Sequence, residues 1–444
     1  MAFFSWRRKP APNGIRRPKS GSSFRPSLEL LEGRIVLSTF LVTNTNDSGA
    51  GSLRDAISRV NADTSNQNPD IVNFQIQGTG PFTINLATEL PAITHALWID
   101  GDSESVFLHQ KAGQIVLDGT AVAGNSVSGL TINAGAVSNT TIQGLAIEHF
   151  SGDGIDASSG GSSVKFRNNV IMTNGNVGID ISGGGSNIQF LYNRITGNYT
   201  AGIDVSMGGS NVTFVNNQIT GTSLQTGVDF SHGGSNLTFT KNNFTGSHGT
   251  SVVNLSGGGS NISFAGNILS GDVRVGLDLT GGGSNITLTH LHVSLTSDTS
   301  MASQVGVHLG GAAAGTVATI SNSVFDAGNA GTGLLLDAMS SSSSISVQTT
   351  DFRSNLVGVS IRGDGMTAGT IDLGGGSLGS TGGNNFRTFR AATATSYAIG
   401  LFNVGSSFAI FAKQNLMDVS DPATTIADGT HDTTAGGIGV ITVA

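Results

Sequence analysis

The sequence predicts an all-β solenoid. It is a single-stranded parallel β-helix in which each coil takes about 24–25 residues. The first observation is a motif that returns at least five times between Gly154 and Val293, with copies that start at Gly154, Gly178, Gly202 and Gly227. Self-similarity of this period is typical of stacked repeats rather than of one globular core. The second is a period-two alternation of apolar and polar residues inside each copy, which indicates short half-buried strands. The 65 glycines in 444 residues fit such turn-dense β structure.

The copy GIDISGGGSNIQFLYNRITG, from Gly178 to Gly197, shows how one coil is built. Strands are expected around Ile179–Ile181, Ile188–Phe190 and Arg194–Thr196. The segments between them are rich in glycine and asparagine, which tolerate a positive φ and form tight turns. Three strands and three turns complete one coil, and each strand then pairs with its equivalent one coil further on, about 4.8 Å away.

Stacking turns each repeat position into a column of side chains. One column is aromatic and is expected to form the core; it consists of Phe166, Phe190, Phe214, Phe239 and Phe264, followed by Leu288. A second column lies three residues further on and is expected to form a buried ladder of amides at a bend; it consists of Asn169, Asn193, Asn217, Asn242 and Asn267.

A third column carries the candidate chemistry. It consists of Asp156, Asp180, Asp204, Asp229, Asn254 and Asp278. The apolar neighbours of each aspartate should point inward, so the carboxylates should point outward, where like charges in adjacent strands repel. A hard cation such as calcium, which prefers carboxylate oxygens, could neutralise this row. The alternative is an exposed row screened by water and salt, with some carboxylates hydrogen-bonded to neighbouring backbone amides.

The chain divides into four parts on composition and period. Residues 1–38 are expected to be a disordered export or sorting segment, because they hold eight basic residues and two acidic ones. Residues 39–80 are expected to cap the solenoid with a short helix, in which Ser52 and Asp55 form a capping box and Leu53, Ile57 and Val60 share one face. The solenoid should occupy residues 81–407 and a closing segment residues 408–444.

Charge and composition exclude several classes of function. The whole chain carries −8 and its first 38 residues +6, so residues 39–444 carry −14, which argues against nucleic acid as a partner. No apolar run reaches the length of roughly 18 residues that would predict a transmembrane helix. Cysteine is absent, which excludes disulfides and thiolate metal sites. The oligomeric state stays open, and the sequence does not exclude a trimer.

Two segments and the columns carry family resemblances. The stretch SLELLEGRIVLS, Ser27–Ser38, resembles the LEPR-XLL type of N-terminal motif in large surface proteins of planctomycete bacteria, although it departs from that motif at Gly33. The columns together resemble the right-handed parallel β-helix repeats of the pectate-lyase-like superfamily over roughly residues 80–420. This resemblance implies a polysaccharide or a cell surface as the usual partner, since the superfamily includes pectate lyases, polygalacturonases, alginate epimerases and phage tailspikes. Fold alone does not assign an activity.

These observations favour a secreted or cell-surface bacterial protein with a structural or adhesive role, which could bind carbohydrate. The alternative is a calcium-dependent polyuronide lyase or epimerase, in which the resemblance implies that Asp180, Asp204 and Asp229 bind the cation. No catalytic residue is assigned, because no arginine in the repeats is marked as a base and the chain has no Asp-Asp pair. The segment GDGIDA, Gly152–Ala157, matches part of a calcium-binding nonapeptide repeat, but it occurs once and at the wrong period, so it predicts no site.

Overall fold

The computed structural model describes most of the chain from Ser38 onward. The described residues are 38–63, 69–104, 114–133, 139–159, 161–221, 226–296, 304–311, 315–328, 331–353, 355–362, 369–387, 397–402, 409–417, 426–427 and 440–442. The predicted export segment, apart from Ser38, lies outside them. None of the helices in the described part is long and apolar enough to cross a membrane.

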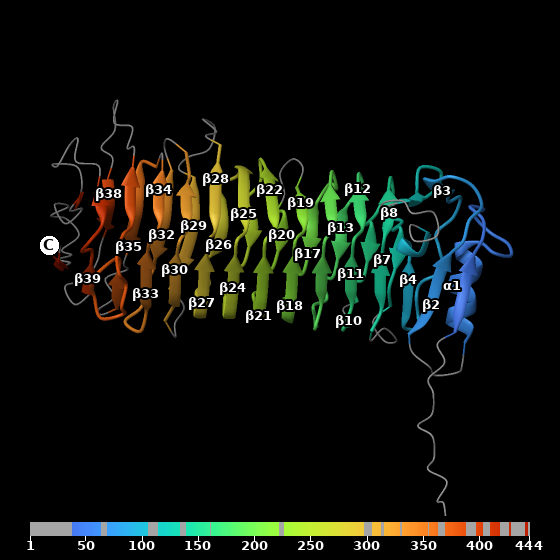
Figure 1. Ribbon diagram of the computed structural model, residues 1–444, viewed down its shortest axis with the longest axis horizontal. Coiled ribbons are helices and arrows are strands. Elements are labelled where there is room, and N and C mark those ends of the chain that lie inside the picture. Colours follow the sequence, from blue (N-terminus) through green and yellow to red (C-terminus); the bar gives the residue numbers. More distant parts are fainter. Residues whose placement is uncertain are drawn as a thin grey trace, which may run out of the picture. The chain divides into compact units, whose positions relative to one another are not determined.

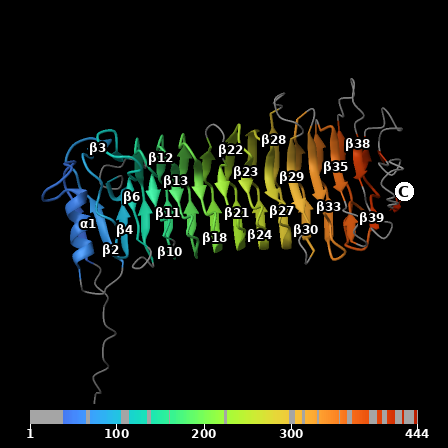
Figure 2. The same cartoon turned by 180° about the vertical axis from the view of Figure 1, so that it is seen from behind.

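The predicted stack of parallel strands is confirmed, with about 11 turns. Figure 1 shows the strands following one another along one axis in sequence order, from blue through green to red, and Figure 2 shows the same stack from behind. Among the described residues, the strands form three parallel sheets of 17, 13 and 12 strands, which we call sheets 1, 2 and 3. The registers agree with the repeat, because Phe166 pairs with Phe190 and Phe190 pairs with Phe214, each time with the equivalent residue one coil further on.

Sheet 1 has 17 strands: β1 (Thr39–Val42), β2 (Asp70–Phe74), β4 (Leu97–Asp100), β7 (Thr141–Gln143), β10 (Gly161–Ser162), β11 (Lys165–Arg167), β14 (Gly185–Ser186), β15 (Gln189–Leu191), β18 (Gly209–Val215), β21 (Gly234–Thr240), β24 (Gly259–Ala265), β27 (Gly283–Thr289), β30 (Val317–Ser321), β33 (Ser344–Gln348), β36 (Thr370–Asp372), β39 (Ala409–Phe411) and β42 (Val440–Thr442).

Sheet 2 has 13 strands: β3 (Phe82–Asn85), β5 (Ile115–Asp118), β8 (Leu145–Glu148), β12 (Val170–Met172), β16 (Arg194–Thr196), β19 (Gln218–Thr220), β22 (Asn243–Ser247), β25 (Ile268–Asp272), β28 (His292–Leu295), β31 (Val324–Asp326), β34 (Asp351–Arg353), β37 (Asn385–Arg387) and β40 (Leu416–Met417).

Sheet 3 has 12 strands: β6 (Leu130–Thr131), β9 (Ile155–Asp156), β13 (Val177–Asp180), β17 (Ala201–Asp204), β20 (Val228–Asp229), β23 (Ser251–Asn254), β26 (Val275–Leu279), β29 (Val305–Gly310), β32 (Thr332–Asp337), β35 (Val357–Arg362), β38 (Tyr397–Phe402) and β41 (Ile426–Ala427).

The aromatic column forms the core, as predicted. Its phenylalanines are fully buried, and four successive pairs of rings stack with centroids 5.4, 4.5, 4.8 and 4.3 Å apart. These distances follow the strand spacing, so each ring lies on its equivalent in the next coil. Leu288 continues the column and is also fully buried.

The buried asparagine ladder is confirmed as well. Asn217 shows the pattern: its Nδ2 donates to the carbonyl of Phe190 (2.8 Å) and to Oδ1 of Asn242 in the next coil (2.9 Å). Its own Oδ1 accepts from the backbone N–H and the amide of Asn193. Each amide therefore satisfies buried backbone groups at the bend between sheets 1 and 2, and the ladder fixes the register of one coil on the next.

The short helix expected near the start is α1 (Leu53–Ala62). The Ser52 hydroxyl accepts the N–H of Asp55 at 3.1 Å, which caps the first turn. Leu53, Ile57 and Val60 are fully buried on one face, and Arg59 lies over the Phe40 ring of β1, 4.9 Å from its centroid. The helix packs its apolar face onto the first strands and covers the apolar side chains at this end of the stack.

Candidate metal centre on sheet 3

The aspartate column lies in register along sheet 3. Asp156 pairs with Asp180, Asp180 with Asp204, Asp204 with Asp229, and the row continues through Asn254 to Asp278. Ile179 and Ile181, which flank Asp180, are buried in the core, while the aspartates are half-buried on the outer face. The row therefore has the outward orientation expected from the alternation of side chains along a strand.

Each carboxylate in this row also holds a turn. The Oδ1 atoms of Asp156, Asp180 and Asp204 accept the backbone N–H two residues on, at 2.8, 2.6 and 2.7 Å. Asn254 and Asp278 make the same contact at 3.0 Å. These hydrogen bonds close the chain as it leaves sheet 3. An asparagine or an aspartate serves this purpose equally well, which explains how Asn254 fits in an acidic row.

An uncharged amide interrupts the row of carboxylates near its middle. Asn254 Nδ2 donates to Oδ1 of Asp229 at 3.0 Å. Burial raises the pKa of Asp229, the neighbouring Asp204 charge raises it further, and the hydrogen bonds from Ser231 and Asn254 oppose both effects. Burial also raises the pKa of Asp180, with added contributions from the Asp204 and Asp156 charges.

The N-terminal end of the row contains a carboxylate that the sequence analysis missed. Asp153, in the turn before β9, is only 7% exposed, and its Oδ1 accepts the N–H of Val177 at 2.8 Å. Asp153, Asp156 and Asp180 each offer an oxygen, and these oxygens all lie within 4.8 Å of one another. The signal was present in GDGIDA, which contains both Asp153 and Asp156.

The carboxyl group of Asp153 is strongly shifted. Burial raises its pKa to about 6, the Asp180 and Asp156 charges add to the shift, and the hydrogen bond from Val177 opposes it. Three carboxylates on a half-buried surface are unfavourable to ionise together, so this end of the row favours either a proton or a cation.

At the other end a histidine ends the row of aspartates. His308 takes the place of an aspartate beside Asp278, and its Nε2 lies 3.6 Å from Oδ2 of Asp337. Burial lowers the pKa of His308, although the Asp278 and Asp337 carboxylates oppose that shift. The acidic row therefore stops at this position, and a carboxylate from β32 approaches the imidazole.

The comparisons with known proteins agree with this architecture. Residues 92–244 match the family model described as "Right handed beta helix region". Together with the stacked parallel sheets, that match decides the fold and its hand. The protein is a right-handed parallel β-helix.

Three solved structures resemble this chain at low sequence identity. A pectate lyase has a TM-score of 0.42 and 15% identity, with 72% of this chain and 81% of that chain covered. Tailspike protein 3 of bacteriophage CBA120 has a TM-score of 0.49 and 12% identity, with 89% of this chain and 59% of that chain covered. A mannuronan C-5 epimerase module from Azotobacter vinelandii has a TM-score of 0.40 and 13% identity, with 85% of this chain and 98% of that chain covered. A search of curated protein sequences found no match.

The donor set of the β-helix at Asp153, Asp156 and Asp180 consists of oxygen atoms only. Such a set fits calcium, which binds carboxylate and carbonyl oxygens in flexible geometry. Of the five aspartates predicted as metal ligands, the structure brings Asp156 and Asp180 into this group, while Asp204, Asp229 and Asp278 follow in later coils. Around the group, the described strands of sheet 3 from β6 to β26 contain no lysine or arginine.

Proposed function

We propose that this β-helix is a secreted or cell-surface protein with a structural or adhesive role, and that the acidic row of sheet 3 is its contact surface. The observation that carries the proposal is the row itself, in which carboxylates of successive coils lie in register on one face. A regular one-dimensional array of like groups suits contact with a repeating polymer, such as a surface polysaccharide, because each coil repeats the same interaction.

The regularity of the row favours a structural role over a catalytic one. An active site usually departs from the local rules of its fold, whereas here each described carboxylate follows the same turn geometry. The row also lies on paired strands that stacked rings and buried amides hold in place, so its spacing is fixed before any ligand arrives. Such preorganisation lowers the entropic cost of binding an extended partner.

Calcium enters the proposal at the N-terminal end of the row. Asp153, Asp156 and Asp180 would bind the cation, and its charge would offset the repulsion between the −14 body of the chain and an acidic polymer. A cation held by three protein carboxylates keeps free coordination positions, which the carboxylates or hydroxyls of a glycan can fill.

A binding assay with the full chain tests the adhesive role. Labelled protein is incubated with insoluble polysaccharides and with bacterial cells, with calcium and with a chelator. We expect retention that falls at least tenfold in the Asp180→Asn, Asp204→Asn double variant. A double variant outside sheet 3, Asp272→Asn with Asp326→Asn, removes the same charge and should bind like the wild type. Equal loss in both variants, or no retention by the wild type, would refute the acidic row as the contact surface.

A second candidate function is a calcium-dependent polyuronide lyase or epimerase, which the convergence of Asp153, Asp156 and Asp180 favours. A calcium ion there would neutralise a uronate carboxylate and make the adjacent C–H more acidic. The test is turnover of pectate and alginate, followed by absorbance of the unsaturated product and by NMR for epimerised units. Turnover that the Asp180→Asn variant loses would support the enzyme, and a wild type inactive with saturating calcium would reject it.

A further inference from the structure

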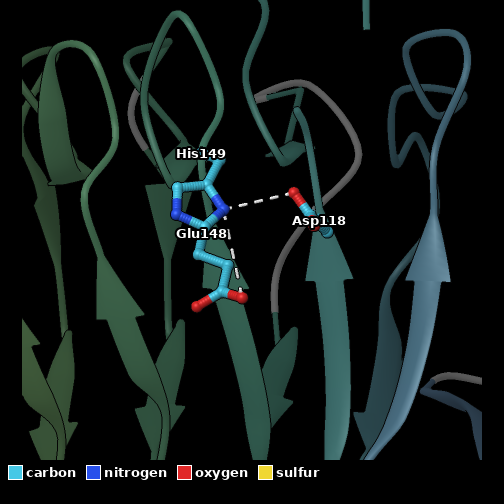
Figure 3. A group of neighbouring side chains, drawn as sticks. All are labelled: Asp118, Glu148 and His149. Atoms are coloured by element: carbon cyan, nitrogen blue, oxygen red, sulfur yellow. Dashed lines mark hydrogen bonds and ion pairs between the residues drawn. The ribbon is translucent and has the colours of Figure 1, made fainter. Parts of the chain in front are cut away.

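A second group of metal-binding side chains lies at a different corner of the coil, where strands of sheet 2 end. Asp118 is the last residue of β5 and Glu148 the last residue of β8, and the two are register partners in adjacent coils. His149 follows Glu148 in a left-handed conformation, with φ 62°. Figure 3 shows the three side chains directed toward one another across the gap between the two coils.

Their ligand atoms converge on one point. Nδ1 of His149 lies 3.2 Å from Oδ1 of Asp118 and 4.0 Å from Oε1 of Glu148. One ligand atom from each of the three residues lies within 4.8 Å of the others. Ligands placed about 2.0–2.1 Å from a tetrahedral zinc ion are roughly 3.4 Å apart, so small side-chain rotations would suffice to coordinate one ion.

Hydrogen bonds already orient the Asp118 carboxylate. Its Oδ1 accepts the backbone N–H of Thr120 at 2.9 Å and the Thr120 hydroxyl at 2.6 Å. A carboxylate that is already oriented needs little rearrangement when a metal binds.

In the part of the chain that the structure describes, no lysine or arginine forms an ion pair with the carboxylates at this corner. Asp118 and Glu148 are like charges in register on adjacent strands, an arrangement that destabilises a sheet. Among the described residues, the ion pairs of both carboxylates are with His149, which is charged only when it is protonated. A divalent ion would satisfy both carboxylates and would take the Nδ1 lone pair of the neutral imidazole.

We propose that Asp118, Glu148 and His149 form a site for a divalent transition metal of the zinc class. The imidazole nitrogen separates this donor set from the oxygen-only group on sheet 3, because nitrogen ligands favour zinc, nickel or copper over calcium. The His149 side chain is 47% exposed, so water can complete the coordination. The site is independent of the proposed function, and it does not share a residue with the calcium group.

The chain contains a matched control at an equivalent corner. His248 follows β22 of sheet 2, also in a left-handed conformation with φ 51°, and its Nδ1 lies 3.1 Å from Oδ2 of Asp272. Ser247, not a carboxylate, precedes it and pairs with Asp272. This corner therefore has the same histidine–aspartate contact without the second carboxylate, and it should bind zinc far more weakly.

The experiment is a calorimetric Zn²⁺ titration of the chelator-treated full chain, with circular dichroism to check each variant's fold. We expect one saturable site that His149→Ala abolishes and that Asp118→Asn or Glu148→Gln weakens at least tenfold. His248→Ala and Asp180→Asn should bind like the wild type. Co²⁺ in place of Zn²⁺ should give visible absorption bands that disappear in His149→Ala.

Three results would overturn the proposal. One is the absence of saturable Zn²⁺ binding, and another is binding that survives His149→Ala. The third is binding that Asp180→Asn removes, which would place the ion on sheet 3.

Discussion

The two ends of the acidic row differ in the side chains that lie beside the carboxylates. At the C-terminal end, His308 replaces an aspartate, with Asp278 beside it in register and Asp337 at 3.6 Å. At the N-terminal end, Asp153 adds a third carboxylate to Asp156 and Asp180 instead. The same strand pattern thus holds a histidine between two carboxylates at the C-terminal end and three carboxylates at the N-terminal end.

This difference separates the structural role of the aspartates from a binding role. Turn formation needs only one side-chain acceptor per coil, and Asn254 supplies it without charge. The extra carboxylate of Asp153 is not needed for the turn after sheet 3, because it lies before β9. Its burial costs stability unless a proton or a cation compensates. The N-terminal end is therefore where a ligand is expected.

The largest effect should come from the scaffold that keeps both ends in register. Asn217→Ala removes the amide that links three coils, so the buried backbone N–H of Asn193 loses its acceptor. The bonds from Nδ2 to the carbonyl of Phe190 and to Oδ1 of Asn242 are lost as well. We expect the free energy of unfolding to fall by about 3 kcal/mol, since each unsatisfied buried group costs about 1–3 kcal/mol. Chemical denaturation measures this change, and a loss below about 1 kcal/mol would contradict the assigned role of the ladder.

At the N-terminal end we expect a smaller effect, which is a gain in stability. Asp153→Asn keeps an acceptor for the Val177 N–H but removes the buried charge. The pKa of about 6, compared with an ordinary 3.8, corresponds to about 3 kcal/mol at most. Without calcium at pH 7, we expect the free energy of unfolding of the variant to exceed that of the wild type by about 2 kcal/mol, as chemical denaturation would measure.

The pH dependence of the Asp153 variant provides its control. Because the folded-state pKa is raised, protonation of Asp153 stabilises the protein below pH 3.8, and that stability is lost as the pH rises through about 6. This decline should be absent in Asp153→Asn. A variant that is less stable than the wild type at pH 7 without calcium would show that the buried charge is already compensated within the protein.

The C-terminal end should respond to pH with the opposite sign. Because burial lowers the pKa of His308, its neutral form is favoured in the folded state, and stability falls as the pH drops below the ordinary value of 6.5. In His308→Gln this acid-side loss should be smaller, while the Asp153 contribution remains. Thermal melts from pH 5 to pH 8 give the melting temperature of the wild type and of His308→Gln. If the two proteins show the same pH dependence, His308 does not cause the loss of stability in acid.

The smallest effect is expected on the exposed asparagine ladder of sheet 1. Asn236 Nδ2 donates to Asn211 at 2.8 Å, but both side chains are exposed. Asn236→Gly suits the φ of 54° and should change the free energy of unfolding by less than about 0.5 kcal/mol, because water replaces the lost bonds. A loss comparable to that of Asn217→Ala would mean that burial does not decide the strength of these ladders.

The repeat made most of the fold predictable. A column of Phe166 and its equivalents can be recognised because stacking converts sequence period into spatial neighbours, and the same holds for the asparagine ladder. Asp153 was missed because it lies outside the repeating columns and occurs in one coil. The Asp118 and His149 contact also joins irregular coils, in which a left-handed residue redirects a side chain, and a column comparison does not detect such contacts.

The most direct test of the contrast is a calorimetric calcium titration of the chelator-treated full chain, beside Asp180→Asn and Asp278→Asn. We predict saturable binding that Asp180→Asn abolishes, that Asp278→Asn retains, and that tightens as the pH rises through about 6, where Asp153 loses its proton. No saturable binding, or equal losses in the two variants, would contradict a cation site at the N-terminal end and would leave the row as a turn-forming ladder.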